Sequence, residues 1–163
     1  MRTHRSTQAG FTYLGLLAVV VIMGIFLTAA ARVWSFTEQR EREIQLLYVG
    51  DQYRMAISRY FAAGHQYPAS LQDLLLDSRS PVPRHYLRQL YPDPMSGDAD
   101  WELIPDPTNV GIMGVASKSK LIPIKRAGFS DIEVGFAGSD CYCAWRFIYS
   151  PRSMTHRYTA PGH

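Results

Sequence analysis

The pattern of apolar and polar positions divides this chain into two unlike parts. Residues 11–31 contain no charged side chain, and 17 of these 21 positions are apolar. An α-helix rises about 1.5 Å per residue, so this run would be roughly 31 Å long, close to the hydrocarbon thickness of a bilayer. The pattern therefore predicts a transmembrane helix over residues 11–31 and a polar domain over residues 32–149.

The residues before the apolar run bear on its orientation and processing. Arg2 and Arg5 precede the run, and positive charge on this flank favours a cytoplasmic N-terminus, which places the polar domain on the outer side. Three interpretations remain open: a signal peptide cleaved near the small residues 29–31, an uncleaved anchor, or cleavage before the run, where Gly10 precedes Phe11.

A second apolar pattern follows the predicted membrane segment. Apolar side chains recur there at helical spacing, at Leu46, Val49, Tyr53, Ala56, Ile57, Tyr60 and Phe61. This stripe predicts an amphipathic helix that ends near Gly64, because a glycine is a common helix C-cap and Pro68 follows shortly after it. The two apolar segments form either one helix over residues 12–63 or two helices divided at residues 35–38.

The remainder of the polar domain predicts short elements. Ser70 and Asp73 have the spacing of a capping box and predict a short second helix. Four strand-like runs follow, at residues 101–104, 111–116, 122–125 and 142–149. Packing the apolar stripe of the long helix against a small antiparallel sheet of three or four strands is the simplest way to bury both, which predicts an α+β fold. Residues 150–163 lack periodicity and predict a flexible tail.

Composition narrows the classes of protein. The 163 residues are 47% apolar and 19% charged, which excludes wholesale disorder and leaves room for one ordinary domain. The net charge is +3 with scattered lysines and arginines, which argues against nucleic acid as a partner. No nucleophile elbow, phosphate loop or zinc-protease motif occurs, so the sequence indicates no enzyme, no catalytic residue and no cofactor.

Two groups of residues are candidates for other chemistry. Cys141 and Cys143 can be core thiols, a disulfide that needs a turn between them, or, least favoured, metal ligands. Asp93, Asp98 and Asp100 lie in a glycine-containing loop, but their spacing is not that of an EF-hand, so a solvated turn is favoured over a calcium site. The sequence therefore predicts no metal site.

The residues at the start of the apolar run resemble a known motif. Gly10-Phe11-Thr12-Tyr13-Leu14 is similar to the cleavage and methylation motif of type IV prepilins and type II secretion pseudopilins. Several later blocks resemble the G-type pseudopilins in the expected order: residues 66–76, residues 90–97, Trp101, residues 111–117 and residues 123–125. The resemblance implies that a prepilin peptidase removes residues 1–10 as a leader and methylates Phe11.

The resemblance also implies a function and a location. The chain would be a pilin-like subunit of a type II secretion pseudopilus, with one pass through the inner membrane, a cytoplasmic N-terminus and a periplasmic domain. Its partners would be other pseudopilins, the peptidase, the inner-membrane assembly platform and lipid. The assembly contacts would come from Leu14, Gly15, Leu17, Val20 and Gly24.

One position departs from the family pattern. The family usually has glutamate where this chain has Gly15, which suits a minor subunit or one that assembles with a glutamate-bearing partner. Two alternatives to a secretion pseudopilin are a minor type IV pilin and a periplasmic binding or enzyme domain behind an ordinary signal or anchor segment.

Overall fold

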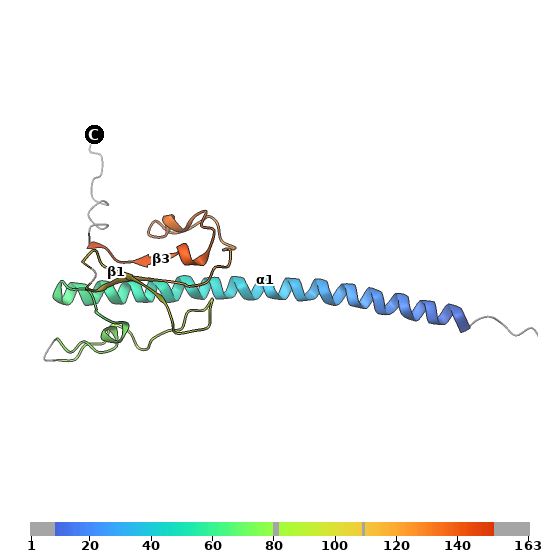
Figure 1. Cartoon of the computed structure of the whole chain (residues 1–163), viewed down its shortest axis with the longest axis horizontal. Helices are drawn as coiled ribbons and strands as arrows, with labels where there is room; N and C mark the ends of the chain where they lie inside the picture. Colours follow the sequence, from blue (N-terminus) through green and yellow to red (C-terminus); the bar gives the residue numbers. More distant parts are fainter. Residues whose placement is uncertain (1–8, 80–81, 109, 152–163) are drawn as a thin grey trace, which may run out of the picture. The chain divides into compact units, whose positions relative to one another are not determined.

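The computed structural model describes residues 9–79, 82–108 and 110–151, and within them the side chains of all but residues 9–12 and 28–33 (Figure 1). Its elements are helix α1 (Ala9–Gly64), the 3₁₀ turns η1 (Leu71–Leu74), η2 (Val134–Phe136) and η3 (Tyr142–Ala144), and strands β1 (Glu102–Pro105), β2 (Ile112–Ala116) and β3 (Arg146–Ile148). The predicted α+β class with a small antiparallel sheet is confirmed.

The chain divides into two units, Met1–Gln39 and Arg40–His163. Residues 1–8 of the predicted leader and residues 152–163 of the predicted tail lie outside the described residues. Within the described residues, no helix is both long enough and apolar enough to cross a membrane.

The three strands form one antiparallel sheet in the order β1-β2-β3. Leu103 pairs with Val115, which pairs with Phe147, so these three residues share one face of the sheet. Val115 and Phe147 are fully buried, and this face packs on the second half of α1. Figure 1 shows β1 and β3 running alongside that part of the helix.

The predicted stripe of α1 supplies the other side of the core. Six of its seven members are buried and belong to the core cluster: Leu46, Val49, Tyr53, Ala56, Ile57 and Tyr60. Helix and sheet are in close contact at Gly50, where a Cβ atom would lie 2.5 Å from the ring of Phe147. The amphipathic pattern thus identifies the buried face of this part of the helix correctly.

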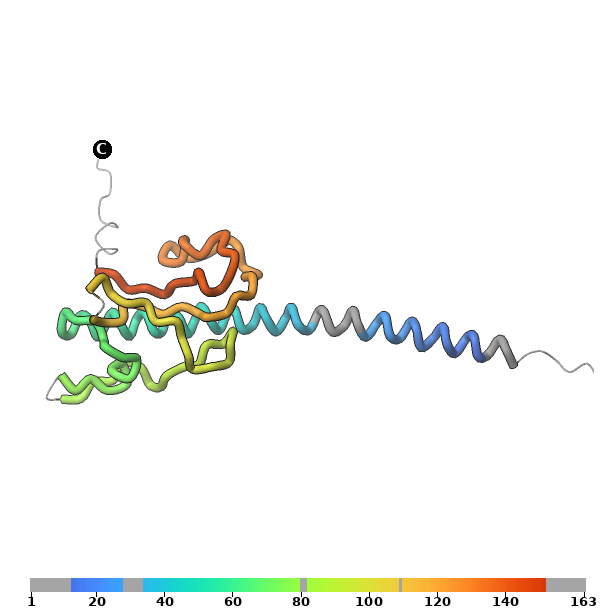
Figure 2. The backbone as a smooth tube through the Cα atoms, in the orientation of Figure 1, coloured from blue at the N-terminus to red at the C-terminus, as the bar shows by residue number. Residues whose placement is uncertain are grey.

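The segment after α1 covers a different side of the helix from the sheet, as the green and orange-red tubes of Figure 2 show. His65 adopts the left-handed conformation (φ 53°) directly after Gly64, and its N–H donates to the carbonyl of Phe61. The predicted capping box forms, because the Asp73 carboxylate accepts the N–H of Ser70 at 3.0 Å. The element it caps is a single 3₁₀ turn.

One strand prediction is wrong, and another is right only in part. Residues 122–125 form no strand, because the N–H groups of Ile124 and Lys125 donate to a buried side chain instead of a neighbouring strand. The run predicted over residues 142–149 is a strand only over Arg146–Ile148, and its first part is the turn η3. Both runs are apolar enough for strands, but their backbone groups pair elsewhere: residues 124 and 125 donate to Glu43, far away in the sequence, and residues 142–144 form the turn η3.

Candidate functional site

The predicted assembly surface lies in the first unit. Gly10 and Phe11 fall in the first turn of α1, and their side chains lie outside the described residues. The large apolar side chains that follow are 44–71% exposed: Tyr13, Leu14, Leu16, Leu17, Val19, Val20, Val21, Ile22, Met23, Ile25, Phe26 and Leu27. They surround the helix instead of forming one stripe. A helix that is apolar all round requires an apolar environment on every side.

The predicted assembly residues do not all share one face. Successive helical residues are rotated by about 100°, which places Leu17, Val20 and Gly24 within one arc of roughly 60°. Leu14 lies beside this arc, whereas Gly15 lies on the opposite side of the helix. A Cβ atom at Gly15 or Gly24 would meet no atom within 4 Å. Both positions therefore leave the backbone open to a close neighbour.

A buried carboxylate lies where the second unit begins. Glu43 is 3% exposed and accepts hydrogen bonds from the N–H of Ile124 (2.8 Å), the N–H of Lys125 (3.1 Å) and the hydroxyl of Tyr142 (2.8 Å). These bonds fasten two segments far along the chain to α1. A buried carboxylate is tolerated only when such donors replace water, so Glu43 positions residues 124 and 125 and the turn η3.

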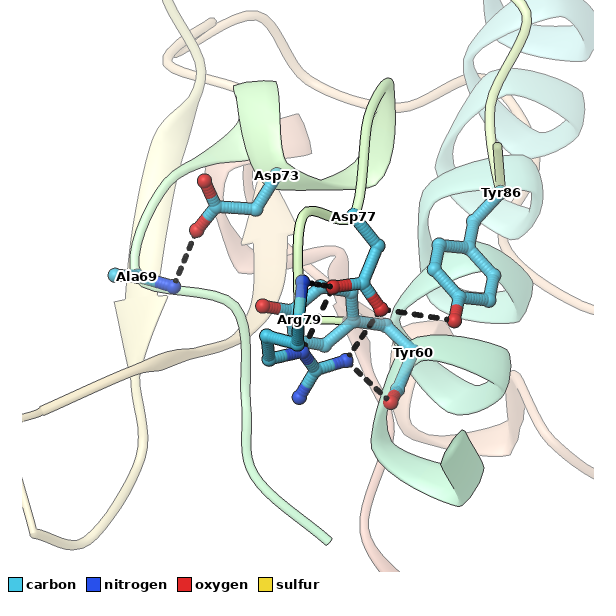
Figure 3. Close-up of polar contacts among 6 residues, drawn as sticks. All are labelled: Tyr60, Ala69, Asp73, Asp77, Arg79 and Tyr86. Carbon is cyan, nitrogen blue, oxygen red and sulfur yellow. Dashed lines mark hydrogen bonds and ion pairs between the residues drawn. The ribbon is translucent and has the colours of Figure 1, made fainter. Parts of the chain in front are cut away.

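A second polar cluster fastens the segment after α1 to the end of the helix (Figure 3). Asp77 is 3% exposed and accepts hydrogen bonds from the N–H of Arg79 (3.0 Å), its Nε (2.9 Å) and its Nη2 (2.8 Å), and from the hydroxyl of Tyr86 (3.1 Å). The Arg79 guanidinium also donates to the carbonyl of Tyr60 and lies 3.5 Å from the centre of its ring. A cation at the C-terminal end of a helix interacts favourably with the helix dipole.

Three side chains of the same cluster have shifted pKa values. The hydrogen bonds from Arg79 hold the pKa of the Asp77 carboxyl well below its usual range, and the pKa of the Arg79 guanidinium rises in return. Burial raises the pKa of Tyr60. Asp77 and Arg79 therefore both stay charged at neutral pH, and the contacts are those of a structural clamp.

Tyr53 of α1 anchors the connection at residues 91–95, which contains Pro92 and Pro94. The hydroxyl of Tyr53 donates to the carbonyl of Tyr91 and accepts its N–H, each at 2.9 Å, while the indole of Trp101 donates to the same carbonyl at 2.8 Å. Burial raises the pKa of Tyr53, which keeps its hydroxyl protonated. The connection at residues 91–95 is thus anchored directly on the long helix.

One of the three aspartates of the next loop differs from its predicted environment. Asp93 is fully buried instead of lying in a solvated turn, and its carboxylate accepts the hydroxyl of Ser117 (2.7 Å) and the N–H of Met95 (2.9 Å). Asp98 and Asp100 are exposed. Within the described part of the chain, no three His, Cys, Asp or Glu side chains are grouped to hold a metal ion.

The two cysteines are joined by a disulfide in the structure, with Cα atoms 5.2 Å apart. The turn η3 makes this spacing attainable, since the extended strand expected here would separate the two Cα atoms by about 6.6 Å. Tyr142, between the cysteines, is fully buried, whereas Cys143 is exposed. The bond therefore borders solvent on one side and the core on the other.

Sequence reasoning overlooked the two anchoring carboxylates. Glu43 is a polar residue of the helix by composition, yet it lies three positions before Leu46 and so continues the buried stripe by one turn. That register is a usable signal for a buried acid. Asp77 offers no such signal, because it lies outside the periodic stripe. Its bonds to Arg79 and Tyr86 form only when the loop folds.

Comparisons with known proteins give no assignment: no protein-family model matches the chain, and neither a curated protein nor a solved structure matches it.

Proposed function

We propose that this chain is a pilin-like subunit of a type II secretion pseudopilus that assembles through its apolar N-terminal helix to support protein export. In this proposal a prepilin peptidase cuts after Gly10 and methylates Phe11. Residues 11–31 anchor the subunit in the inner membrane, with the N-terminus cytoplasmic and the domain periplasmic. The inner-membrane assembly platform then moves the subunit into a filament with other pseudopilins.

One observation carries the proposal. The large side chains from Tyr13 to Leu27 are apolar on all sides of the helix, and they begin within the motif that resembles a prepilin cleavage site. Such a surface suits lipid before assembly and neighbouring helices afterwards. An ordinary cleaved signal peptide would discard this helix, whereas cleavage after Gly10 keeps it on the mature subunit.

Two glycines of the apolar segment, Gly15 and Gly24, refine the proposal. Gly24 lies in the arc with Leu17 and Val20, where a small residue lets a neighbouring helix approach closely. Gly15, on the opposite side, supplies no carboxylate to meet the positive N-terminus of a neighbour. We therefore assign the chain to a minor position, next to a subunit that carries the glutamate.

The decisive experiment is the mass and N-terminal sequence of the mature chain from its native host. We expect the chain to begin at methylated Phe11. Gly10→Val should block this processing because it enlarges the residue before the cut, while Gly24→Val, the same change within the helix, should leave processing intact. A mature chain that begins near residue 32, or that retains Met1, would contradict the proposal.

Loss of the gene separates secretion from pilus function. For a secretion pseudopilin we expect export of secreted proteins to fail while twitching and DNA uptake continue. The opposite result would assign the chain to a type IV pilus as a minor pilin.

A further inference from the structure

The disulfide between Cys141 and Cys143 has an accessible side. Cys143 is exposed and lines a groove of about 780 Å³ on the outer face of the sheet, while Cys141 is half-buried. A bond that closes a loop of only three residues restricts the unfolded chain less than a long-range disulfide does. Opening this bond therefore need not unfold the domain.

The groove beside Cys143 is cationic. Lys118, Lys120 and Arg146 line it together with one carboxylate, that of Glu102. Lys118 also forms an ion pair with Asp100, whereas Lys120 and Arg146 form no ion pair with an acidic side chain among the described residues. Positive charge attracts an incoming thiolate and stabilises a thiolate that forms nearby.

The inner side of the disulfide is coupled to a loop. The N–H of Tyr142 donates to the carbonyl of Leu121, and the N–H of Cys143 donates to that of Ser119, each at 3.1 Å. The hydroxyl of Tyr142 donates to Glu43, the same carboxylate that holds the N–H groups of residues 124 and 125. The conformation of η3 and the docking of residues 119–125 on α1 thus share one network.

We propose that this disulfide is a thiol–disulfide exchange site for a dithiol protein, and that its opening loosens residues 119–125 from Glu43. A thiolate of the dithiol attacks the exposed Cys143 sulfur, which breaks the disulfide and releases Cys141 as a thiolate. The second thiol of the dithiol then attacks the first sulfur of the dithiol, which is bonded to Cys143 in the mixed disulfide, and this releases Cys143 as a thiolate. The dithiol is oxidised to a disulfide, and this chain gains two electrons and, after protonation, two thiols.

The proposal is independent of pseudopilus assembly, because every residue it uses lies in the second unit. Its first test is the bond itself in the full chain, trapped by alkylation before lysis. We expect both cysteines to be protected from alkylation in a fraction of the molecules and to react after dithiothreitol without denaturant. Two free thiols in every molecule, or a bond that opens only in denaturant, would overturn the proposal.

The second test addresses the groove. Opening by glutathione, which carries net negative charge, is compared with opening by neutral 2-mercaptoethanol at low salt. The double variant Lys120→Gln, Arg146→Gln should slow the glutathione reaction about threefold to fivefold relative to the neutral thiol. Both side chains are exposed, so the variant should fold normally. An unchanged ratio of the two rates would exclude the groove as the approach route.

The third test addresses the coupling, by amide hydrogen exchange in the full chain. Reduction should raise exchange at the N–H groups of Ile124, Lys125 and Tyr142 by about tenfold, and leave Val115 in the sheet unchanged. Tyr142→Phe should raise exchange at residues 124 and 125 with the disulfide intact. Equal exchange in the oxidised and reduced chains would show that the bond does not hold the loop.

Discussion

Four buried carboxylates, those of Glu43, Asp77, Asp93 and Asp106, accept hydrogen bonds from the main chain of irregular segments. Such segments have no neighbouring strand to satisfy their N–H groups, and a buried N–H without an acceptor is costly. Each acid therefore fixes one loop at one place. The described part of the domain has only three short strands. Side chains there accept main-chain hydrogen bonds that neighbouring strands would accept in a larger sheet.

Asp77 lends itself to a test by pH. Asp77→Asn removes the acceptor charge and should lower the free energy of unfolding by about 1–2 kcal/mol at pH 7. The pKa of Asp77 is lowered in the folded chain, so its contribution is complete above about pH 4 and is lost as the pH falls further. The difference between wild type and variant should therefore shrink as the pH falls below about 4.

The measurement is urea unfolding of the detergent-solubilised chain, followed by tryptophan fluorescence at several pH values. Asp131→Asn, which neutralises an exposed carboxylate, is the matched control and should change stability little at any pH. A deficit in Asp77→Asn that stays constant down to the lowest pH would show that the carboxylate contributes through shape alone.

At the scale of elements, the contact between α1 and β3 depends on a missing side chain. Gly50 lies in the buried stripe, and the ring of Phe147 occupies the space that a Cβ atom would need. Phe147 is fully buried and packs against Phe136, with ring centres 5.1 Å apart, so it has little room to move. The glycine lowers helix propensity and in exchange lets the strand approach the helix.

Gly50→Ala tests which of these two effects dominates. Helix propensity alone would raise stability by about 1 kcal/mol. We expect instead a loss of about 1–3 kcal/mol, because an added methyl group in a filled core forces its neighbours to shift. Gly135→Ala, whose Cβ would meet no atom within 4 Å, serves as the control in the same urea experiment. A stabilised Gly50→Ala variant would mean that Phe147 yields easily.

At the scale of the whole molecule, the core is confined to the second unit. Every described member of the core cluster lies at Leu46 or later, and the buried carboxylate of Glu43 also lies within Arg40–His163. The apolar surface before residue 28 contributes nothing to that cluster. The folded core thus lies in the second unit, and the surface proposed for assembly lies in the first.

Truncation follows from this division. A chain that begins at Arg40 should fold without detergent and unfold cooperatively, with a free energy of unfolding within about 1 kcal/mol of the full chain. A chain that begins at Met55 should not fold, because it lacks Leu46, Val49 and Tyr53 of the core. Circular dichroism and urea unfolding distinguish the two. A chain from Arg40 that remains unfolded would show that the first unit is needed for the domain.

The success of sequence reasoning depended on whether the pattern was periodic. The stripe from Leu46 to Tyr60 predicted the buried face of α1, since a helix repeats its contacts every three or four residues. The cap at Ser70 was also predictable, because both partners are close in sequence. The run at residues 122–125 was mistaken for a strand, since its backbone donates to Glu43, more than 80 positions away.

The sequence by itself determined which stretches are apolar throughout, which are amphipathic, and hence the α+β class and the buried face of the helix. These properties depend on local periodicity and composition, which need no knowledge of distant partners. Only the tertiary structure decided the fate of the buried acids, the turn that joins the two cysteines, and the glycine that Phe147 requires. Each of these depends on partners that the fold brings together from distant positions, such as Glu43 with Ile124 or Gly50 with Phe147, and the spacing of residues along the chain does not identify those partners.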